Sequence, residues 1–274
     1  MGDTGGGYSE RGLALAWATR SDVGLRRSAN EDSVLAEPPV FAVADGMGGH
    51  AAGDRASAAV VARLHEATGA PATDVAAIVA ALSAARLDID AIAEGIPVGV
   101  GTTVTGVAVV TRGEEPALLV FNVGDSRTYA LRDGRLDRLT VDHSVVQELV
   151  DAGVIDAAQA EHHPESNVIT RAIGFREEPR PDLWLVPARG GERLLLCSDG
   201  LTKEVPEPRI AELLAAGEDA DATAQLLLDA ALEAGGSDNV SVVVVDVTAA
   251  PDPAEPWEAE RVDPPAPPRP ESSD

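Results

Sequence analysis

The chain has 274 residues, of which 45% are hydrophobic and 24% charged, so it can build a sizeable core and is not disordered over most of its length. Its 46 acidic and 21 basic residues give a net charge of -25, which argues against nucleic acid or an anionic membrane as a partner. A single cysteine, Cys197, excludes an internal disulfide framework, and no apolar run is long enough to span a bilayer, so we expect a cytoplasmic protein without a membrane span.

The predicted elements form one domain over residues 12–248, between two polar ends. Residues 1–11 are rich in glycine and are expected to be disordered. Residues 249–274 form an acidic segment that holds eight of the 19 prolines, and we expect this tail to be disordered too. Such segments bury too little apolar surface to offset the entropy lost on ordering.

Hydrophobic patterns within the domain predict alternating groups of strands and helices. In chain order they are strands at 13–19 and 40–44, helices at 52–67 and 74–93, strands at 103–110, 117–123, 127–132 and 135–139, a helix at 144–162, strands at 183–186 and 193–198, helices at 207–215 and 221–234, and a strand at 240–247. Strands joined by hairpins, with helices in pairs, favour antiparallel pairing. We therefore predict an α+β fold of two packed antiparallel β-sheets flanked by helices, a four-layer sandwich.

Four aspartates stand at the ends of predicted strands. Asp45, Asp125 and Asp199 follow apolar strands, and Asp238 comes just before one. Taken singly, each is an ordinary turn residue. Together they can converge on one rim of a sheet, where mutual repulsion raises their pKa values unless a cation neutralises them. Oxygen ligands without a Cys or His cluster favour Mg²⁺ or Mn²⁺ over Zn²⁺, and two such ions form a hydrolytic centre for phosphate esters.

A fifth segment, residues 21–33, supplies a group suited to phosphate. It places Arg27 close in sequence to Glu31 and Asp32. The planar guanidinium group of arginine binds two phosphate oxygens at once. We expect the neighbouring Arg26 to be solvated.

Eight motifs in order along the chain carry a family resemblance. They are Arg27 with Asn30-Glu31-Asp32, Asp45-Gly46-Met47-Gly48-Gly49-His50, Gly101-Thr102-Thr103, residues 123–127, Asp142-His143-Ser144, residues 169–174, residues 197–201, and Ser237-Asp238-Asn239. One Asp-Gly pair is uninformative, but eight ordered motifs are specific. The chain resembles the metal-dependent protein Ser/Thr phosphatases of type 2C in their bacterial form, whose fold is a pair of antiparallel sheets flanked by helices.

The resemblance implies a set of ligands for two ions, Mn²⁺ or Mg²⁺. Asp45 is expected to bridge both ions, and the Gly46 carbonyl oxygen to bind the second. Asp199 and Asp238 are expected to complete the ligand set of the first ion, and Glu31 to face the second ion. These four carboxylates balance two divalent ions, so the centre attracts a phosphate group even though the whole protein is strongly acidic.

The remaining roles also follow from the resemblance. Arg27 binds the substrate phosphate, and Asp32 is grouped with it as a catalytic residue behind Glu31. Asp125 resembles the residue that holds a weaker third ion, with Asn167 near a further contact to that ion. Residues 145–168 correspond to a mobile flap beside the site.

One position departs from many eukaryotic members of the family. They place a histidine directly after the Asp-Gly pair, where this chain has Met47, as bacterial members commonly do. His50 follows nearby, and we expect it to be structural. Protonation of the leaving group is therefore assigned to a metal-bound water.

The function implied is hydrolysis of phosphoserine and phosphothreonine in proteins by direct attack of a metal-bridging water. The enzyme would act in opposition to Ser/Thr protein kinases. We expect it to be a monomer. Two alternatives stay open. One is a phosphatase acting on a small molecule or on an anti-sigma-type regulatory phosphoprotein. The other is a non-catalytic phosphoprotein-binding module on the same fold, although the chain keeps its acidic metal residues and Arg27.

Overall fold

Two antiparallel sheets form the centre of the protein. The computed structural model describes residues 5–48, 52–97, 99–161, 163–253 and 257–264, so His50 and residues 265–274 lie outside the described residues. The first sheet has six strands in the order β1-β2-β13-β12-β8-β9. Their bounds are β1 Gly5–Glu10, β2 Leu13–Asp22, β13 Val240–Ala249, β12 Arg193–Cys197, β8 Arg127–Arg132 and β9 Arg135–Arg138.

The second sheet has eight strands, in the order β10-β5-β4-β6-β7-β11-β14 with β3 paired to β4. Their bounds are β10 Ile173–Gly174, β5 Val100–Thr102, β4 Val40–Gly48, β6 Val104–Arg112, β7 Glu115–Val123, β11 Asp182–Pro187, β14 Glu260–Arg261 and β3 Asp32–Glu37. The sequence patterns did not predict β3, β5 or β10. All three pair antiparallel with their neighbours, as do the other strands.

Central strands are apolar on both faces because each sheet is covered on both sides. In β4, Ala42 and Ala44 face the helices, while Phe41 and Val43 face the other sheet. In the same way β13 alternates between a helix-facing cluster and the cluster between the sheets. A strand buried on both faces has a nearly continuous apolar sequence, which explains the valine run of β13.

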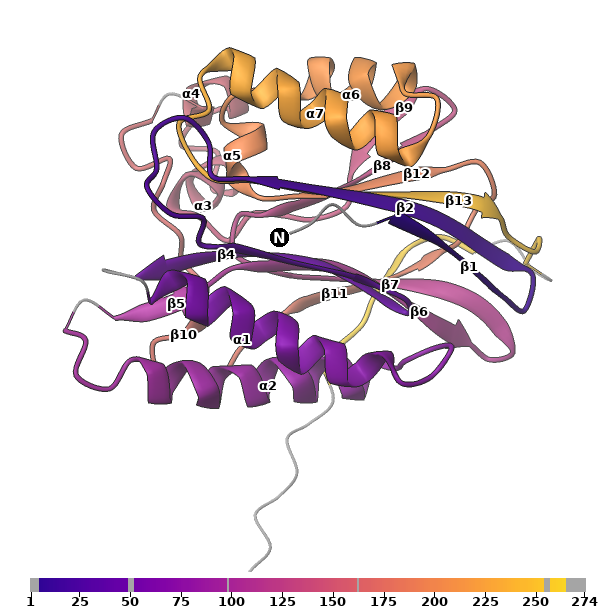
Figure 1. Cartoon of the computed structure of the whole chain (residues 1–274), viewed down its shortest axis with the longest axis horizontal. Coiled ribbons are helices and arrows are strands. Elements are labelled where there is room, and N and C mark those ends of the chain that lie inside the picture. Colours follow the sequence, from indigo (N-terminus) through magenta and orange to yellow (C-terminus); the bar gives the residue numbers. More distant parts are fainter. Residues whose placement is uncertain (1–4, 49–51, 98, 162, 254–256, 265–274) are drawn as a thin grey trace, which may run out of the picture.

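Paired helices cover the outer face of each sheet. On the eight-stranded sheet lie α1 (Gly53–His65), which continues into the 3-10 helix η1 (Glu66–Thr68), and α2 (Val75–Ile92). On the six-stranded sheet lie α6 (Glu207–Ala216) and α7 (Ala220–Ala234), so Figure 1 shows four layers. The predicted α+β sandwich is confirmed. Among the described residues, every helix is too short or too polar to cross a membrane.

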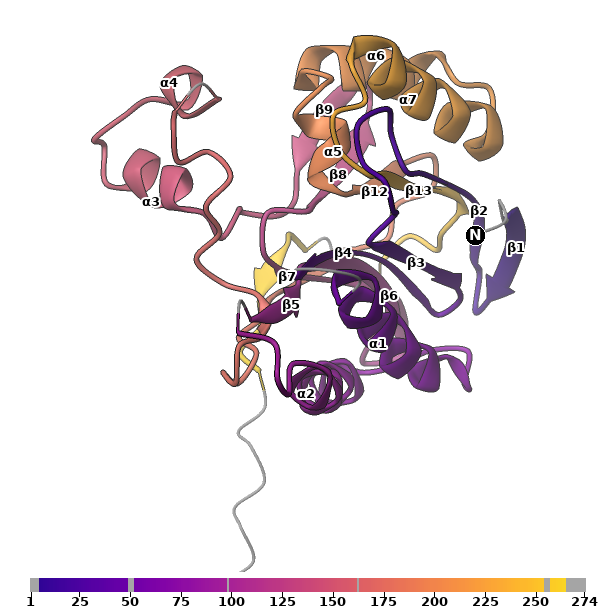
Figure 2. The same cartoon turned by 60° about the vertical axis from the view of Figure 1, so that its left-hand side comes forward.

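The predicted helix at 144–162 is two helices, α3 (Val145–Asp151) and α4 (Ala157–Glu161). The Gln159 amide N–H donates to Asp156 Oδ1, and the Asp156 amide N–H donates to Gln159 Oε1, each at 2.8 Å. This reciprocal cap starts a new helix at Asp156 and divides the segment. Figure 2 shows both helices standing out from the sandwich.

Within the described residues, each end of the chain contains a strand, although disorder was predicted for both ends. Residues 5–10 form β1 by pairing antiparallel with β2, where Gly6 stands opposite Trp17. A Cβ on Gly6 would lie 2.5 Å from the Trp17 ring, so the glycine lets this ring lie against the strand. In the acidic tail, β14 pairs with β11, and the Arg112 guanidinium lies 4.7 Å from the Trp257 ring centroid. Glycine and proline content indicated flexible ends, whereas aromatic contacts order them.

Candidate metal centre and phosphate site

A pocket of about 560 Å³ gathers the motifs where strand ends meet the short helix α5 (Asp199–Thr202). It is lined by Arg27, Glu31, Asp45, Gly46, Met47, Gly48, Thr103, Asp125, Asn167, Ile169, Asp199, Lys203, Ser237, Asp238 and Asn239. Every predicted site residue except Asp32 is in this set. Folding therefore brings together the strand-end aspartates, as their sequence positions predicted.

Asp45 lies near the end of β4 and is fixed through its backbone. Its amide N–H donates to Thr103 Oγ1 at 3.2 Å, and its carbonyl oxygen accepts from Thr102 Oγ1 at 2.8 Å and from the Thr103 amide at 2.9 Å. The Gly101-Thr102-Thr103 motif thus positions Asp45. Burial, followed by the charges of Asp32 and Asp199, raises the pKa of Asp45 well above its ordinary value.

Gly46 is the point where three backbone segments meet. A Cβ there would lie 2.0 Å from the Gly53 carbonyl oxygen and 2.6 Å from the Glu31 carbonyl oxygen. The Gly46 amide donates to that Glu31 oxygen at 3.1 Å. Because glycine permits this approach, the Glu31 side chain lies beside Gly53 at the start of α1 and lines the same pocket as Asp45. Burial and the charge of Asp54 raise the pKa of Glu31.

Asp32 lies behind the pocket rather than in its lining. It stands opposite Asp45 in the β3–β4 register, is only 7% exposed, and does not line the pocket. Ser198 Oγ donates to its Oδ2 at 2.8 Å, while its Oδ1 is buried without a hydrogen-bond partner. Burial raises the pKa of Asp32 to about 7. This position fits support of Asp45 better than contact with a substrate.

Two cations contact the carboxylates of Asp199 and Asp238. Arg27 Nη2 lies 2.7 Å from Asp238 Oδ2. Lys203 Nζ forms an ion pair with Asp199 Oδ2 and lies 3.9 Å from Asp238 Oδ2. Within the described residues, no three Asp, Glu, His or Cys side chains already surround one point as metal ligands. The ammonium and guanidinium groups neutralise these carboxylates instead.

Asp125 lies at the far side of the pocket, after β7. Burial, followed by the charge of Asp199, raises its pKa to about 7. The preceding Gly124 amide donates to His143 Nδ1 at 3.1 Å. Burial, followed by the charge of Arg171, lowers the pKa of His143, so a neutral imidazole accepts this bond. His143 therefore has a structural role.

The donors of the pocket fit divalent cations that prefer oxygen ligands. The Oδ1 atom of Asp199 is buried and has no hydrogen-bond partner. Burial, followed by the charges of neighbouring carboxylates, raises the pKa values of Asp45 and Asp125, so a bound cation would stabilise their ionised forms. A carboxylate and carbonyl donor set of this kind suits Mg²⁺ or Mn²⁺.

Three contributions to the site were not predicted from the sequence. Lys203 faces Asp199 because it follows it by one helical turn, a spacing that could have indicated the pair. Asn239 Oδ1 accepts from the Glu31 amide at 2.8 Å, which pins the Arg27 loop to the Asp238 segment. Arg127 binds both carboxylate oxygens of Asp142 at 2.6–3.0 Å and so joins two of the motifs.

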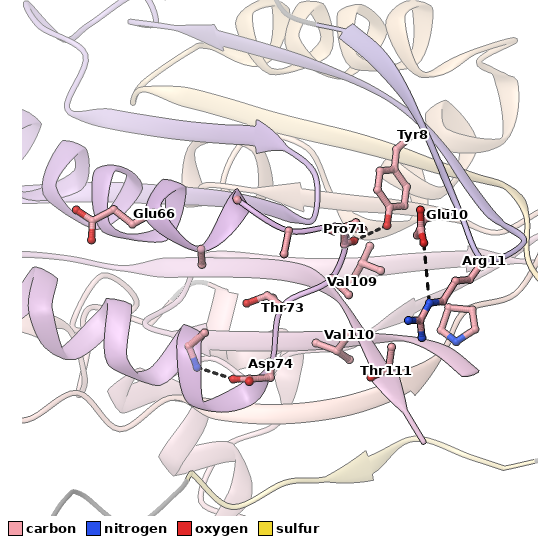
Figure 3. A pocket seen from close by; sticks show the side chains of 16 residues that line it. Tyr8, Glu10, Arg11, Glu66, Pro71, Thr73, Asp74, Val109, Val110 and Thr111 are labelled. Atoms are coloured by element: carbon pink, nitrogen blue, oxygen red, sulfur yellow. Dashed lines mark hydrogen bonds and ion pairs between the residues drawn. The ribbon is translucent and has the colours of Figure 1, made fainter. Parts of the chain in front are cut away.

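A second pocket, of about 660 Å³, lies between β1, the segment around Pro71, and β6 (Figure 3). None of the predicted site residues lines it. Its polar groups interact with one another: Tyr8 Oη donates to the Pro71 carbonyl oxygen, and Arg11 Nε lies 3.9 Å from Glu10 Oε1. The carboxylate-lined pocket is therefore the candidate site, although it is the smaller of the two.

Fold and site together define a two-sheet sandwich with an acidic pocket at the strand ends. The family model for protein phosphatase 2C matches residues 27–233, and the chain belongs to the protein phosphatase 2C family. The resemblance seen in the eight motifs is confirmed.

Curated relatives agree with this family. The chain is 46% identical over 239 residues to the serine/threonine protein phosphatase PstP of Mycobacterium tuberculosis. The matched region covers 86% of this chain but only 45% of PstP, so the chain spans less than half the length of that relative. It is 35% identical over 248 residues to the serine/threonine phosphatase stp of Listeria monocytogenes, with 83% of this chain and 94% of that protein covered.

Solved structures give the same result. The crystal structure of the M. tuberculosis serine/threonine phosphatase PstP/Ppp is similar with a TM-score of 0.79 and 42% identity, over 86% of this chain and 99% of that chain. The PstP catalytic domain in complex with two manganese ions has a TM-score of 0.77 and 42% identity, over 85% and 98%.

Proposed function

We propose that this protein is a metal-dependent protein phosphatase that hydrolyses phosphoserine and phosphothreonine. The observation that carries the proposal is the convergence of Asp45, Asp199 and Asp238 with Glu31 and Arg27 on one pocket. Four separate segments of the chain contribute these groups. A binding module would not need so many carboxylates around its phosphate-binding arginine, among them Asp45 and Asp125 with raised pKa values.

Two divalent ions would be held by the carboxylates of Asp45, Asp199, Asp238 and Glu31 and by the Gly46 carbonyl oxygen. The manganese-bound PstP domain supports Mn²⁺ as one such ion. When bound, the ions supply an activated water and neutralise charge on the phosphate ester. Asp199 Oδ1, which has no hydrogen-bond partner, is available as a ligand for one of these ions.

Arg27 would bind and orient the phosphate group. Its side chain is 53% exposed and reaches Asp238 from the loop before β3. Release from Asp238 makes its guanidinium available to two phosphate oxygens, which fixes the substrate over the acidic pocket. The α3–α4 segment would form the predicted flap, because Asn167 and Ile169 line the same pocket.

The proposal also covers the substrates of the enzyme, its opposing enzymes, its location and its oligomeric state. Phosphorylated proteins are the substrates, and Ser/Thr protein kinases act in opposition. We place the enzyme in the cytoplasm as a monomer. The one cysteine of the chain, Cys197, is free and buried, which fits a reducing compartment.

The test compares the full chain with its Asp45→Asn variant on a phosphothreonine peptide and on a panel of small phosphate esters. We expect Mn²⁺-dependent release of phosphate from the peptide, and a loss of at least about a hundredfold in the variant, because a carboxylate that would hold the ions loses its charge. Excess EDTA should abolish turnover. Full activity in EDTA, or preference for a small ester, would contradict the proposal.

A further inference from the structure

Lys203 is the only lysine of the chain, and it lies in the acidic pocket. Its ammonium pairs with Asp199 Oδ2 and lies 3.9 Å from Asp238 Oδ2. Asp125 lines the same pocket, and its charge acts on Lys203. The lysine thus faces three carboxylates, and one of them, Asp125, is the residue that the family resemblance associates with a third ion.

The backbone fixes this ammonium relative to both of its partners. Lys203 ends the single turn of α5, and its amide donates to the Asp199 carbonyl oxygen at 2.8 Å. The next residue, Glu204, accepts from the Ser237 amide at 2.9 Å through Oε1. Because Ser237 precedes Asp238, the short helix is tied to the Asp238 segment as well.

Lys203 differs from the other cation of the pocket, Arg27. The Arg27 side chain is half exposed and comes from a loop, so it can turn from Asp238 to a phosphate group. The Lys203 side chain is only one-third exposed and comes from an anchored turn. An ammonium is also a compact point charge, closer to a metal ion than a planar guanidinium is.

The two oxygens of Asp199 are used differently. Lys203 binds Oδ2, while Oδ1 is buried and has no hydrogen-bond partner. This division leaves one oxygen for a metal ion without breaking the lysine pair. It also orients the carboxylate, because a carboxylate held by one oxygen has a restricted rotation.

We propose that Lys203 is a tethered counter-cation of the metal centre, which positions Asp199 and replaces a third divalent ion beside Asp125. This inference rests on the proposed function. With Asp125 counted, the pocket holds five carboxylates, and two divalent ions together with the ammonium neutralise them. The charge of Arg27 then remains for the substrate phosphate.

The test counts the Mn²⁺ ions bound by the metal-free full chain, using isothermal titration calorimetry and the electron paramagnetic resonance signal of free Mn²⁺. We expect two ions in the wild type. Lys203→Met keeps the stem but loses the charge, and it should bind one more ion. That extra ion should disappear in the Lys203→Met/Asp125→Asn double variant. Lys203→Arg, the matched control that keeps the charge, should stay at two.

Three ions in the wild type, or two in Lys203→Met with unchanged affinity, would overturn the role of Lys203 and leave the phosphatase proposal intact. Failure of the wild type to bind Mn²⁺ would overturn both.

A second measurement does not depend on the folding of a variant. Amine-reactive reagents can label only Lys203 and the N-terminal amine, since the chain has no other lysine. If Lys203 remains paired with Asp199 in the loaded enzyme, Mn²⁺ leaves its labelling rate unchanged or lowers it. A rise of severalfold on adding Mn²⁺ would show that metal displaces the lysine, which contradicts the proposal.

Discussion

Gly46 occupies a position in β4 where no side chain fits. The Gly46→Ala variant would place a methyl group 2.0 Å from the Gly53 carbonyl oxygen, so the start of α1 must move away from β4. We expect a loss of roughly 1–3 kcal/mol or more in the free energy of unfolding, because both neighbours are backbone atoms. We also expect weaker Mn²⁺ binding, since Glu31 moves with the same junction. Urea unfolding and Mn²⁺ titration measure the two effects.

Gly69→Ala is the matched control for this variant, because a Cβ at Gly69 meets nothing within 4 Å. It should leave both stability and Mn²⁺ affinity near wild type. If Gly46→Ala behaved like this control, the close approach of β4, Glu31 and α1 would not be a property of the protein in solution.

At the scale of single elements, helix α2 offers a comparison between two leucines. Leu82 is fully buried in the cluster between α1, α2 and the eight-stranded sheet, whereas Leu87 is 58% exposed. Leu82→Ala leaves a cavity and should lower the free energy of unfolding by about 2–5 kcal/mol. Leu87→Ala should change it by less than about 0.5 kcal/mol. Equal effects in chemical denaturation would show that α2 presents a different face to the sheet.

Sequence patterns predict an element well when its signal is local, such as a strand buried on both faces or a helix cap. They predict it poorly when the element depends on one contact with a distant part of the chain. The valines of β13 and the Asp74 cap of α2 gave both elements correctly, because each signal is local. The strands β1 and β14 were missed, because one depends on the Trp17 ring and the other on pairing with a distant strand. Long-range contacts of this kind leave no periodic pattern in a sequence.

In the candidate site, too, residues with a local sequence signal were predicted and residues that depend on distant contacts were not. Aspartates at strand ends were recognisable because an apolar run ends or begins within two residues of each of them. The position of Asp32 behind Asp45 depends on the register of β3, a strand that the sequence did not predict. The four-residue spacing of Asp199 and Lys203 is compatible with a pair, but it indicates one only if the segment is helical, and α5 is too short to give a periodic signal.

For the molecule as a whole, the crowded carboxylates predict an unusual dependence of stability on pH. The pKa values of Asp32 and Asp125 rise from 3.8 to about 7 on folding, so the native state binds more protons than the unfolded state in this range. Their stabilising contribution is therefore present at low pH and is lost as the pH rises through about 7. The metal-free protein should melt at a higher temperature at about pH 6.5 than at about pH 8.

Two comparisons check this prediction. Asp125→Asn removes one of the carboxyl groups whose pKa is raised, so its melting temperature should depend less on pH. Saturating Mn²⁺ should also reduce the dependence, because the ions replace protons, and it should stabilise the fold by about 2.7 kcal/mol at 100 times the dissociation constant. A metal-free protein that gains stability between these pH values would contradict the raised pKa values. His143 acts in the opposite sense, since its pKa is lowered, but mainly below about pH 6.5.

The strand pairing at the end of the eight-stranded sheet has a consequence for how copies of the protein meet. The segment around β14 takes up backbone groups of β11, with the Val262 amide donating to the Leu183 carbonyl oxygen at 2.9 Å, and Arg261 binds Asp182 beside it. A bare β11 would be a template for strand addition by a second molecule. By covering these backbone groups of β11, the short segment around β14 leaves less of the strand exposed to edge-to-edge pairing with a second molecule.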